Sequence, residues 1–70
     1  MNTALLRAKI VEKEMTIEGF CEKYGFSRAT FARKIKGETE FNRSEMEVIT
    51  RALDLTSSEM GRIFFPDLVA

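Results

Sequence analysis

The sequence predicts an all-α domain made of five short helices. Two observations carry this prediction: residue types that cap helix N-termini recur along the chain, and the apolar residues between them follow a helical period instead of strand alternation. Each cap has an apolar residue directly before it and another four positions after it, which is the spacing of a hydrophobic staple. The caps are Thr16, Ser27, Asn42 and Thr56. Because no linker or internal repeat divides the 70 residues, residues 1–70 are expected to form one compact domain.

The composition argues against several classes of protein. Hydrophobic residues make up 44% and charged residues 31% of the chain, as in an ordinary globular domain. No apolar run approaches the roughly 18 residues of a membrane span, and the N-terminal residues lack a signal-peptide pattern, so we expect a cytoplasmic protein without a membrane partner. Without histidine and with Cys21 as the single cysteine, zinc-type clusters and Ser-His or Cys-His nucleophile pairs are missing. We therefore expect no enzyme, no metal, no cofactor and no small-molecule ligand.

The first and last helices have recognisable ends. The first is expected to begin at Asn2 or Thr3 and to end near Lys13. Its apolar stripe consists of Leu6 and Ile10, flanked by Leu5 and Val11. The fifth helix is expected over 57–65, because Pro66 disfavours helical geometry in the residue before it. Its buried residues are expected to be Met60, Phe64 and Ile63.

The three middle helices are separated by turns that contain glycine. The second is expected over 17–24 and ends at Gly25, which can adopt a left-handed conformation. The third is expected over 28–36 and ends at Gly37, and the fourth over 43–53. Their buried residues are expected to be Phe20, Cys21 and Tyr24, then Phe31 and Ile35, then Met46, Ile49 and Leu53. In the fourth and fifth helices, Glu45 and Glu59 stand at N3, where a glutamate can complete a capping box.

The basic residues are concentrated between residues 23 and 36. This segment carries five basic and no acidic residues, although the whole chain has 11 of each. A helix that starts two residues after a glycine-ended helix is typical of a helix-turn-helix, whose later helix lies in the DNA major groove. A basic patch on a neutral chain can bind phosphates, because the attraction depends on which charges face them. The stretch 16–37 therefore predicts a nucleic-acid-binding unit, with a solvated helix face as the alternative.

Side-chain direction on the third helix separates the residues that face the core from the residues that could contact DNA. At about 100° per residue, Phe31 and Ile35 point to the core. The residues expected to contact bases are Arg28, Ala29 and Arg33. Arginine can pair bidentately with guanine, and an alanine methyl can pack on a thymine methyl. The residues expected to contact phosphates are Ser27, Thr30, Lys34, Lys36 and Arg43. For the charged residues, solvated surface or an ion pair with a nearby glutamate is the alternative.

A series of residues in a fixed order links the chain to a known family. These residues are Thr16, the Phe20-Cys21 pair, Gly25, the run Ser27-Arg28-Ala29-Thr30-Phe31, Gly37, Phe41, Glu45, Ile49, Leu53 and the run Ile63-Phe64-Phe65. With them the chain resembles the phage repressor and Cro-like helix-turn-helix (xenobiotic-response-element) family of transcriptional regulators. The resemblance implies a compact five-helix repressor-like domain whose second and third helices form the helix-turn-helix. It also implies binding to double-stranded operator DNA, commonly as a dimer on a two-fold site.

The chain departs from the family pattern at several positions. Glu14 stands where the family often has a glycine that ends the first helix, so this turn is expected to be strained or differently closed. Ile17 replaces the usual polar phosphate contact, so none is assigned there. Glu38 and Glu40 lie in a loop expected near phosphates, where they oppose binding unless they turn outward. Lys34 occupies a position that is often apolar.

We expect a sequence-specific DNA-binding transcriptional regulator, a repressor or Cro-like protein of phage or mobile-element type. One alternative is a protein-interaction module, such as an antitoxin-like or regulator-binding subunit, that does not itself read DNA. Another is an architectural factor that bends DNA. A homodimer is expected through the last helix and the apolar tail, with folding of the tail onto the first and fifth helices as the alternative. The residues concerned are Phe64, Phe65, Leu68 and Val69.

Overall fold

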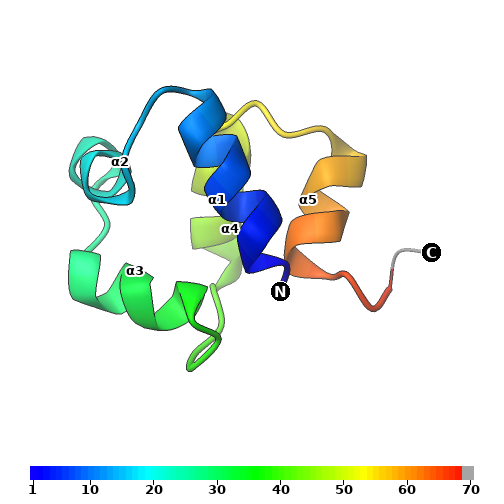
Figure 1. The fold of residues 1–70 in the computed structure, drawn as a ribbon. Coiled ribbons are helices and arrows are strands. Elements are labelled where there is room, and N and C mark those ends of the chain that lie inside the picture. Colours follow the sequence, from blue (N-terminus) through cyan, green and yellow to red (C-terminus); the bar gives the residue numbers. More distant parts are fainter. Residues whose placement is uncertain (69–70) are drawn as a thin grey trace.

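The computed structural model describes residues 1–68, which contain five α-helices and no strand (Figure 1). The helices are α1 (Thr3–Glu12), α2 (Ile17–Tyr24), α3 (Arg28–Ile35), α4 (Arg43–Ala52) and α5 (Ser57–Phe64). The predicted all-α class is therefore confirmed. Four of the predicted helix ends fall one residue too late, because the residue concerned is the C-cap, which follows the last residue of the helix. These C-caps are Lys13, Lys36, Leu53 and Phe65.

All the predicted helix starts are confirmed by their hydrogen bonds. In each helix the N-cap side chain accepts a hydrogen bond from the backbone N–H three residues later. The caps are Asn2, Thr16, Ser27, Asn42 and Thr56. Glu45 and Glu59 also accept a hydrogen bond from the cap's own N–H, at 2.8 and 2.9 Å, and complete two capping boxes. A cap of this kind contributes about 1 kcal/mol, which matters in a domain of this size.

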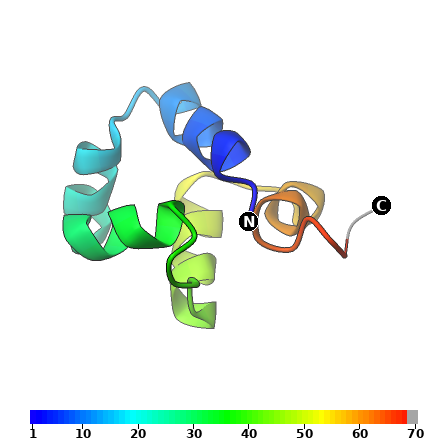
Figure 2. The same cartoon turned by 60° about the horizontal axis from the view of Figure 1, so that its bottom comes forward.

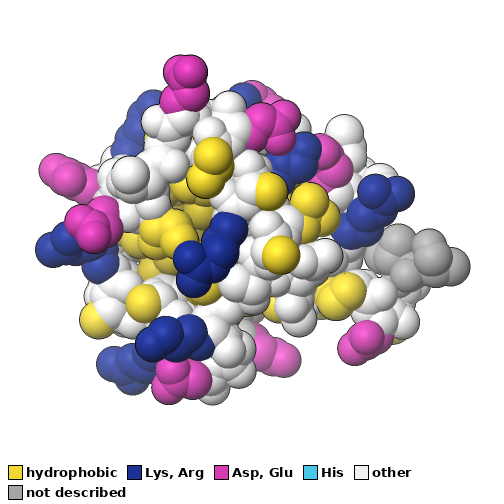
Figure 3. All heavy atoms as spheres, in the orientation of Figure 1, with side chains coloured by type: hydrophobic (Ala, Val, Ile, Leu, Met, Phe, Trp, Pro, Cys, Tyr) yellow, Lys and Arg dark blue, Asp and Glu magenta, His cyan; other side chains and the backbone are white. Residues whose placement is uncertain are grey.

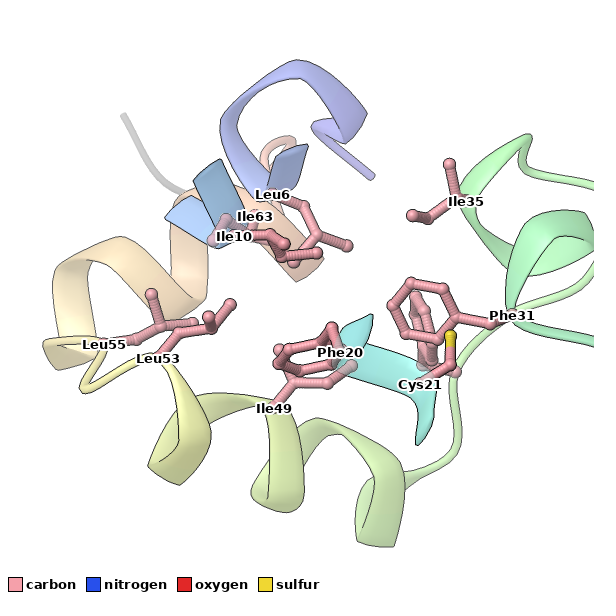
Figure 4. Packing of buried hydrophobic residues seen from close by; sticks show 11 residues of the cluster. Leu6, Ile10, Phe20, Cys21, Phe31, Ile35, Ile49, Leu53, Leu55 and Ile63 are labelled. Carbon is pink, nitrogen blue, oxygen red and sulfur yellow. The ribbon is translucent and has the colours of Figure 1, made fainter. Parts of the chain in front are cut away.

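The core lies between all five helices (Figure 4). Leu6, Ile10 and Ile63 form one group, where α1 meets α5, and Phe20 lies between Ile49 and Phe31. The remaining buried apolar residues are Cys21, Ile35, Phe41, Leu53 and Leu55. Each helix thus contributes at least one fully or nearly fully buried side chain. This burial supplies most of the stabilisation, because each such side chain contributes roughly 1.5–3 kcal/mol when it leaves water.

The structure corrects some predictions of burial. Val11 is 69% exposed, because it points away from the face of α1 that carries Leu6 and Ile10. In α5, Ile63 is fully buried, whereas Met60 and Phe64 are only partly buried and pack at the edge of the core. The same is true of Tyr24 and Met46.

The five helices place α2 and α3 at one end of the molecule and α5 at the other (Figures 1 and 2). α1 packs against both α2 and α5, and α2 packs against α3. α3 and the loop after it come to the front in Figure 2, with α4 next to them. None of the helices in residues 1–68 combines the length and hydropathy needed to cross a bilayer.

Two turns use left-handed backbone without glycine. Glu14 has φ 58° and Asp54 has φ 51°, at the ends of α1 and α4, where a non-glycine residue is strained. The expected strain at Glu14 is thus confirmed. The two turns are also joined to each other, because Lys13 Nζ lies 2.8 Å from Asp54 Oδ2.

Candidate nucleic-acid interface

The α2–α3 unit is closed by a glycine turn. Gly25 has φ 77°, and the next residue, Phe26, donates its N–H to the carbonyl oxygen of Cys21 at 2.9 Å. Ser27 then caps α3. Because the turn needs only Gly25 and Phe26 before the cap, the two helices are held at a fixed angle. The predicted role of Gly25 is confirmed.

The inner side of α3 is anchored by aromatic packing. Phe31 and Ile35 are 1% and 2% exposed. The ring centroid of Phe31 lies 5.7 Å from that of Phe20, 5.3 Å from that of Phe26 and 5.4 Å from that of Phe41. These distances are typical of favourable aromatic pairs. The rings are therefore committed to the core and to holding α3.

The outer side of α3 carries the predicted readers. Arg28, Ala29 and Arg33 are all exposed, as are the predicted phosphate contacts in and next to this helix, apart from one lysine. The exposed phosphate candidates are Ser27, Thr30, Lys36 and Arg43. In Figure 3, basic side chains gather along the lower edge of the molecule, beneath α3, with acidic side chains beside them. All three predicted readers thus lie exposed on α3.

The exposed arginines differ in their partners. Arg28 Nη1 lies 3.1 Å from Glu18 Oε2, and Arg43 Nε lies 3.4 Å from Glu47 Oε1. Such solvent-exposed pairs contribute only about 0–1 kcal/mol, so a phosphate or a base can replace them. Arg33 and Lys36 make no ion pair with any residue in the described range 1–68. Of the alternatives considered for Arg33, the ion pair with a glutamate is not observed there.

Lys34 differs from the other phosphate candidates. Its Nζ lies 2.5 and 2.7 Å from the two carboxylate oxygens of Glu45 and 5.7 Å from the ring centroid of Phe41. The side chains of Lys34 and Glu45 are only 13% and 20% exposed. Burial raises the pKa of Glu45, but the hydrogen bonds from Lys34 and Asn42 outweigh it, so this pKa lies below its ordinary value. The ammonium group of Lys34 is therefore already neutralised by a carboxylate within the fold.

The loop after α3 carries the two glutamates that the sequence placed near phosphates. Glu38 and Glu40 are both exposed. The N–H of Glu38 donates to the carbonyl oxygen of Arg33 at 3.0 Å, so the loop starts directly against the end of α3. Gly37, with φ 86°, makes this sharp exit possible.

Sequence reasoning missed three residues that hold α3. Thr3 Oγ1 donates to the carbonyl oxygen of Ile35 at 2.7 Å, although the two residues are 32 positions apart. Glu18 pairs with Arg28, and Glu45 pairs with Lys34. Glu45 was recognised as part of a capping box and of the family series, but not as the partner of Lys34. Nothing in a single sequence indicates the hydrogen-bond partner of Thr3. For Lys34 there was an indication, because a charged residue at an often apolar position needs a partner of opposite charge within the fold.

The remaining chemistry of the described residues is limited. They contain no group of three or more histidine, cysteine or acidic residues that could hold a metal. Cys21 is fully buried between α2 and its neighbours. Burial raises the pKa of its thiol, and the charge of Arg28 offsets this only in part. The thiol is thus placed as a packing group.

A glycine-closed pair of short helices, with an anchored second helix and basic residues on its outer side, defines a helix-turn-helix protein. Residues 6–60 match the family model described as Cro/C1-type HTH DNA-binding domain, and the chain belongs to this family. The resemblance read from the sequence is therefore confirmed, and with it a DNA-binding domain. Comparison with curated proteins and with solved structures gave no match.

Proposed function

We propose that the protein is a transcriptional regulator that reads a double-stranded operator sequence with α3 in the major groove. The observation that supports this most directly is the division of α3 into a buried side and an exposed basic side. Phe31 and Ile35 fix the helix, and Arg28 and Arg33 remain exposed on it. A repressor or Cro-like protein of phage or mobile-element type is the proposed biological form.

The contacts divide into base readers and phosphate clamps. Arg28 and Arg33 each offer a bidentate fork to guanine O6 and N7, and Ala29 offers a methyl group to thymine. Ser27 and Thr30 lie at the N-terminus of α3, where exposed N–H groups and the helix dipole favour a phosphate oxygen. Lys36 follows α3, and Arg43 begins α4. We propose these last four as phosphate contacts and leave Lys34 out because Glu45 neutralises it.

Selection of bound duplexes from a fragment library, including DNA upstream of the protein's own gene, tests this function. We expect one enriched sequence, with an affinity that falls steeply as salt rises, because bound phosphates release counterions. We also expect the specific site to be bound at least 10³-fold more tightly than unrelated duplex. No enrichment, or a flat salt dependence, would refute the proposal.

A homodimer is proposed through α5 and the residues after it. Phe65 is 42% exposed and Leu68 is 82% exposed, while Phe64 is partly buried at the edge of the core. Val69, which was expected to take part, lies outside the described residues. Exposed apolar residues at one end of a small domain are typical of a self-association surface. Sedimentation equilibrium of the full chain and a Phe65→Ser variant tests this, with the variant expected to shift toward monomer.

One observation favours the second candidate function, a protein-interaction module that does not read DNA. A hollow of about 520 Å³ lies between α4 and α5 and is lined mainly by apolar surface, including Met46, Met60 and Phe65. A partner protein could fill such a hollow. The duplex selection separates the two candidates, because an interaction module is expected to enrich no sequence.

A further inference from the structure

The ion pair between Lys34 and Glu45 connects the recognition helix to the helix that follows it. Lys34 lies in the last turn of α3, and Glu45 is the N3 residue of α4. The carboxylate of Glu45 accepts from Lys34 Nζ at 2.5 and 2.7 Å and from the N–H of Asn42 at 2.8 Å. One carboxylate thus fixes both the start of α4 and the side of α3.

The burial of this pair distinguishes it from the other ion pairs of α3 and α4. With 13% and 20% exposure, the two side chains are far less accessible than the Arg28–Glu18 pair, at 68% and 76%. A partly buried pair is screened less by water and salt than an exposed one. Loss of one partner would also leave the other charge poorly solvated, which makes the pair difficult to break. We therefore expect the ion pair between Lys34 and Glu45 to stay intact when a phosphate approaches.

The position of Lys34 on α3 allows the ion pair to restrain the rotation of this helix about its own axis. The helix has eight residues and is held from the core side by Phe31 and Ile35. These two apolar side chains share a face, so they set the depth of the helix and its approximate rotation, and a directed hydrogen bond on another side of the helix restrains that rotation further. Lys34 follows Arg33 directly, about 100° around the helix. A hydrogen-bonded tether at Lys34 thus restrains the rotation that sets the direction of Arg33.

We propose that Lys34 and Glu45 are positioning residues that set the rotation of α3, and that Lys34 does not itself contact phosphate. This inference rests on the proposed function, because it concerns the direction of the base-reading arginines. It assigns Glu45, an acidic residue, a favourable part in DNA recognition. Electrostatics alone gives the opposite expectation, since a carboxylate near DNA opposes binding.

The substitution Glu45→Gln tests the proposal by the sign of its effect. Glutamine keeps an oxygen that can accept from the N–H of Asn42, but it removes the charge that holds Lys34. We expect affinity for the selected operator duplex to fall about tenfold, while affinity for an unrelated duplex stays the same or rises. Fluorescence anisotropy on both duplexes measures the ratio. A ratio equal to that of the parent, or a higher operator affinity, would overturn the inference.

Glu47→Gln is the matched control. It removes a carboxylate two residues further along α4, where Glu47 has the exposed Arg43 as its only ion-pair partner within residues 1–68. We expect it to leave the ratio of specific to non-specific affinity unchanged. If it lowered the ratio as much as Glu45→Gln, the effect would belong to the charge of α4 and the inference would fail.

Lys34 variants distinguish positioning from a phosphate contact. Lys34→Met is expected to lower the ratio with an unchanged salt slope, and Lys34→Arg to restore most of it, because arginine can still bind Glu45. A phosphate contact predicts another result, namely an equal loss on both duplexes and a salt slope smaller by about 1. That result would overturn the inference. Circular dichroism confirms that each variant is folded at the temperature of the titration.

The free protein offers a measurement independent of DNA. Backbone amide chemical shifts of α3 are expected to move in Glu45→Gln and to stay unchanged in Glu47→Gln, even if both variants are less stable. Unmoved α3 shifts in Glu45→Gln would overturn the inference. A parent protein that enriches no duplex would instead refute the proposed function, so the two failures are distinguishable.

Discussion

Arg33 differs from the other arginine of α3 in having no carboxylate partner among residues 1–68. Neither neighbour offers a free cation to DNA, because Ala32 is uncharged and Lys34 is paired with Glu45. An unpaired guanidinium on an anchored helix loses little when it enters the groove, because no intramolecular bond has to be broken. Arg33 is therefore the residue at which base reading is best tested.

We expect Arg33→Ala to weaken binding to the selected operator by about 1–3 kcal/mol and to relax discrimination at one base pair. Titration of operators substituted at each position measures this. Lys36→Ala serves as the comparison, since loss of a phosphate clamp is expected to weaken specific and unrelated duplexes alike. If Arg33→Ala binds its operator as tightly as the parent, the assignment of the reading face is wrong.

The backbone of Glu14 is strained. Its φ of 58° is left-handed, and glycine adopts this region without the clash of a β-carbon. We expect Glu14→Gly to raise the free energy of unfolding by about 0.5–1 kcal/mol, after allowance for the greater freedom of glycine in the unfolded chain. Urea unfolding measures this difference.

Gly25→Ala is the converse control for backbone strain. A β-carbon at Gly25 would meet no atom within 4 Å, so its cost would come from φ 77° alone. We expect a loss of about 1–2 kcal/mol. A stabilised Gly25→Ala variant, or a destabilised Glu14→Gly variant, would contradict the strain argument.

Among the elements, α3 is held by contacts at both ends and along its side. Ser27 caps its start, Lys34 ties its side to α4, and Thr3 binds the carbonyl oxygen of Ile35 at its end. Carbonyl groups in the last turn of a helix have no partner within the helix, so the hydroxyl of Thr3 supplies one. The N-terminal residues of α1 thereby support the recognition helix directly.

We expect Thr3→Val to lower the free energy of unfolding by about 0.5–1.5 kcal/mol, because it keeps the shape of the side chain and removes the hydroxyl donor. Amide hydrogen exchange is expected to speed up in the last turn of α3. Thr39→Val, in the exposed loop after α3, is the control and should stay within about 0.5 kcal/mol of the parent. Equal effects of the two variants would show that the Thr3 bond does not support α3.

The helices also show which features a single sequence can predict. Four starts were predictable from one local rule, because a cap and its staple lie within six neighbouring residues, and two of them add a capping box. The first start was expected at Asn2 or Thr3, and the helix begins at Thr3. Gly25 and the inward direction of Phe31 follow from equally local rules. The bonds of Thr3 to Ile35 and of Lys34 to Glu45 join different helices, so they depend on how the helices pack. Burial in α5 was predicted imperfectly for the same reason, since the side of α5 that faces α1 is decided by packing.

For the whole molecule, stability is expected to depend on pH through a few paired carboxylates. The hydrogen bond from Lys9, and then that from the N–H of Thr56, lowers the pKa of Glu59 below its ordinary value of 4.5. The pKa of Glu45 is also lowered, against the effect of its burial. A carboxylate with a lowered pKa contributes stability that is present above 4.5 and is lost as pH falls through the lowered value.

Two lysines act at the opposite end of the pH range. The hydrogen bonds from Lys9 to Glu59 and from Lys13 to Asp54 raise the pKa of each lysine above 10.5. Their contribution is present below 10.5 and is lost as pH rises through the raised values. We therefore expect a plateau in the free energy of unfolding between about pH 5 and 10, with a fall on either side.

Urea unfolding at pH values from about 3 to about 11 measures this profile. Glu59→Gln is expected to reduce the slope of the acid limb, because the variant has one fewer proton to take up on unfolding. Stability that rises as pH falls from about 5 to 3 would contradict the assignment of lowered pKa values to Glu45 and Glu59.

The fully buried Cys21 makes the packing of α2 in the core observable without any added label. A thiol reagent can reach this sulfur only after the packing around α2 opens, and no second cysteine competes with it. The rate of its modification under native conditions therefore reports the free energy of local opening in the helix-turn-helix itself. Bound operator should slow this chemistry in proportion to occupancy, so a colorimetric thiol assay becomes a binding assay on the unmodified protein.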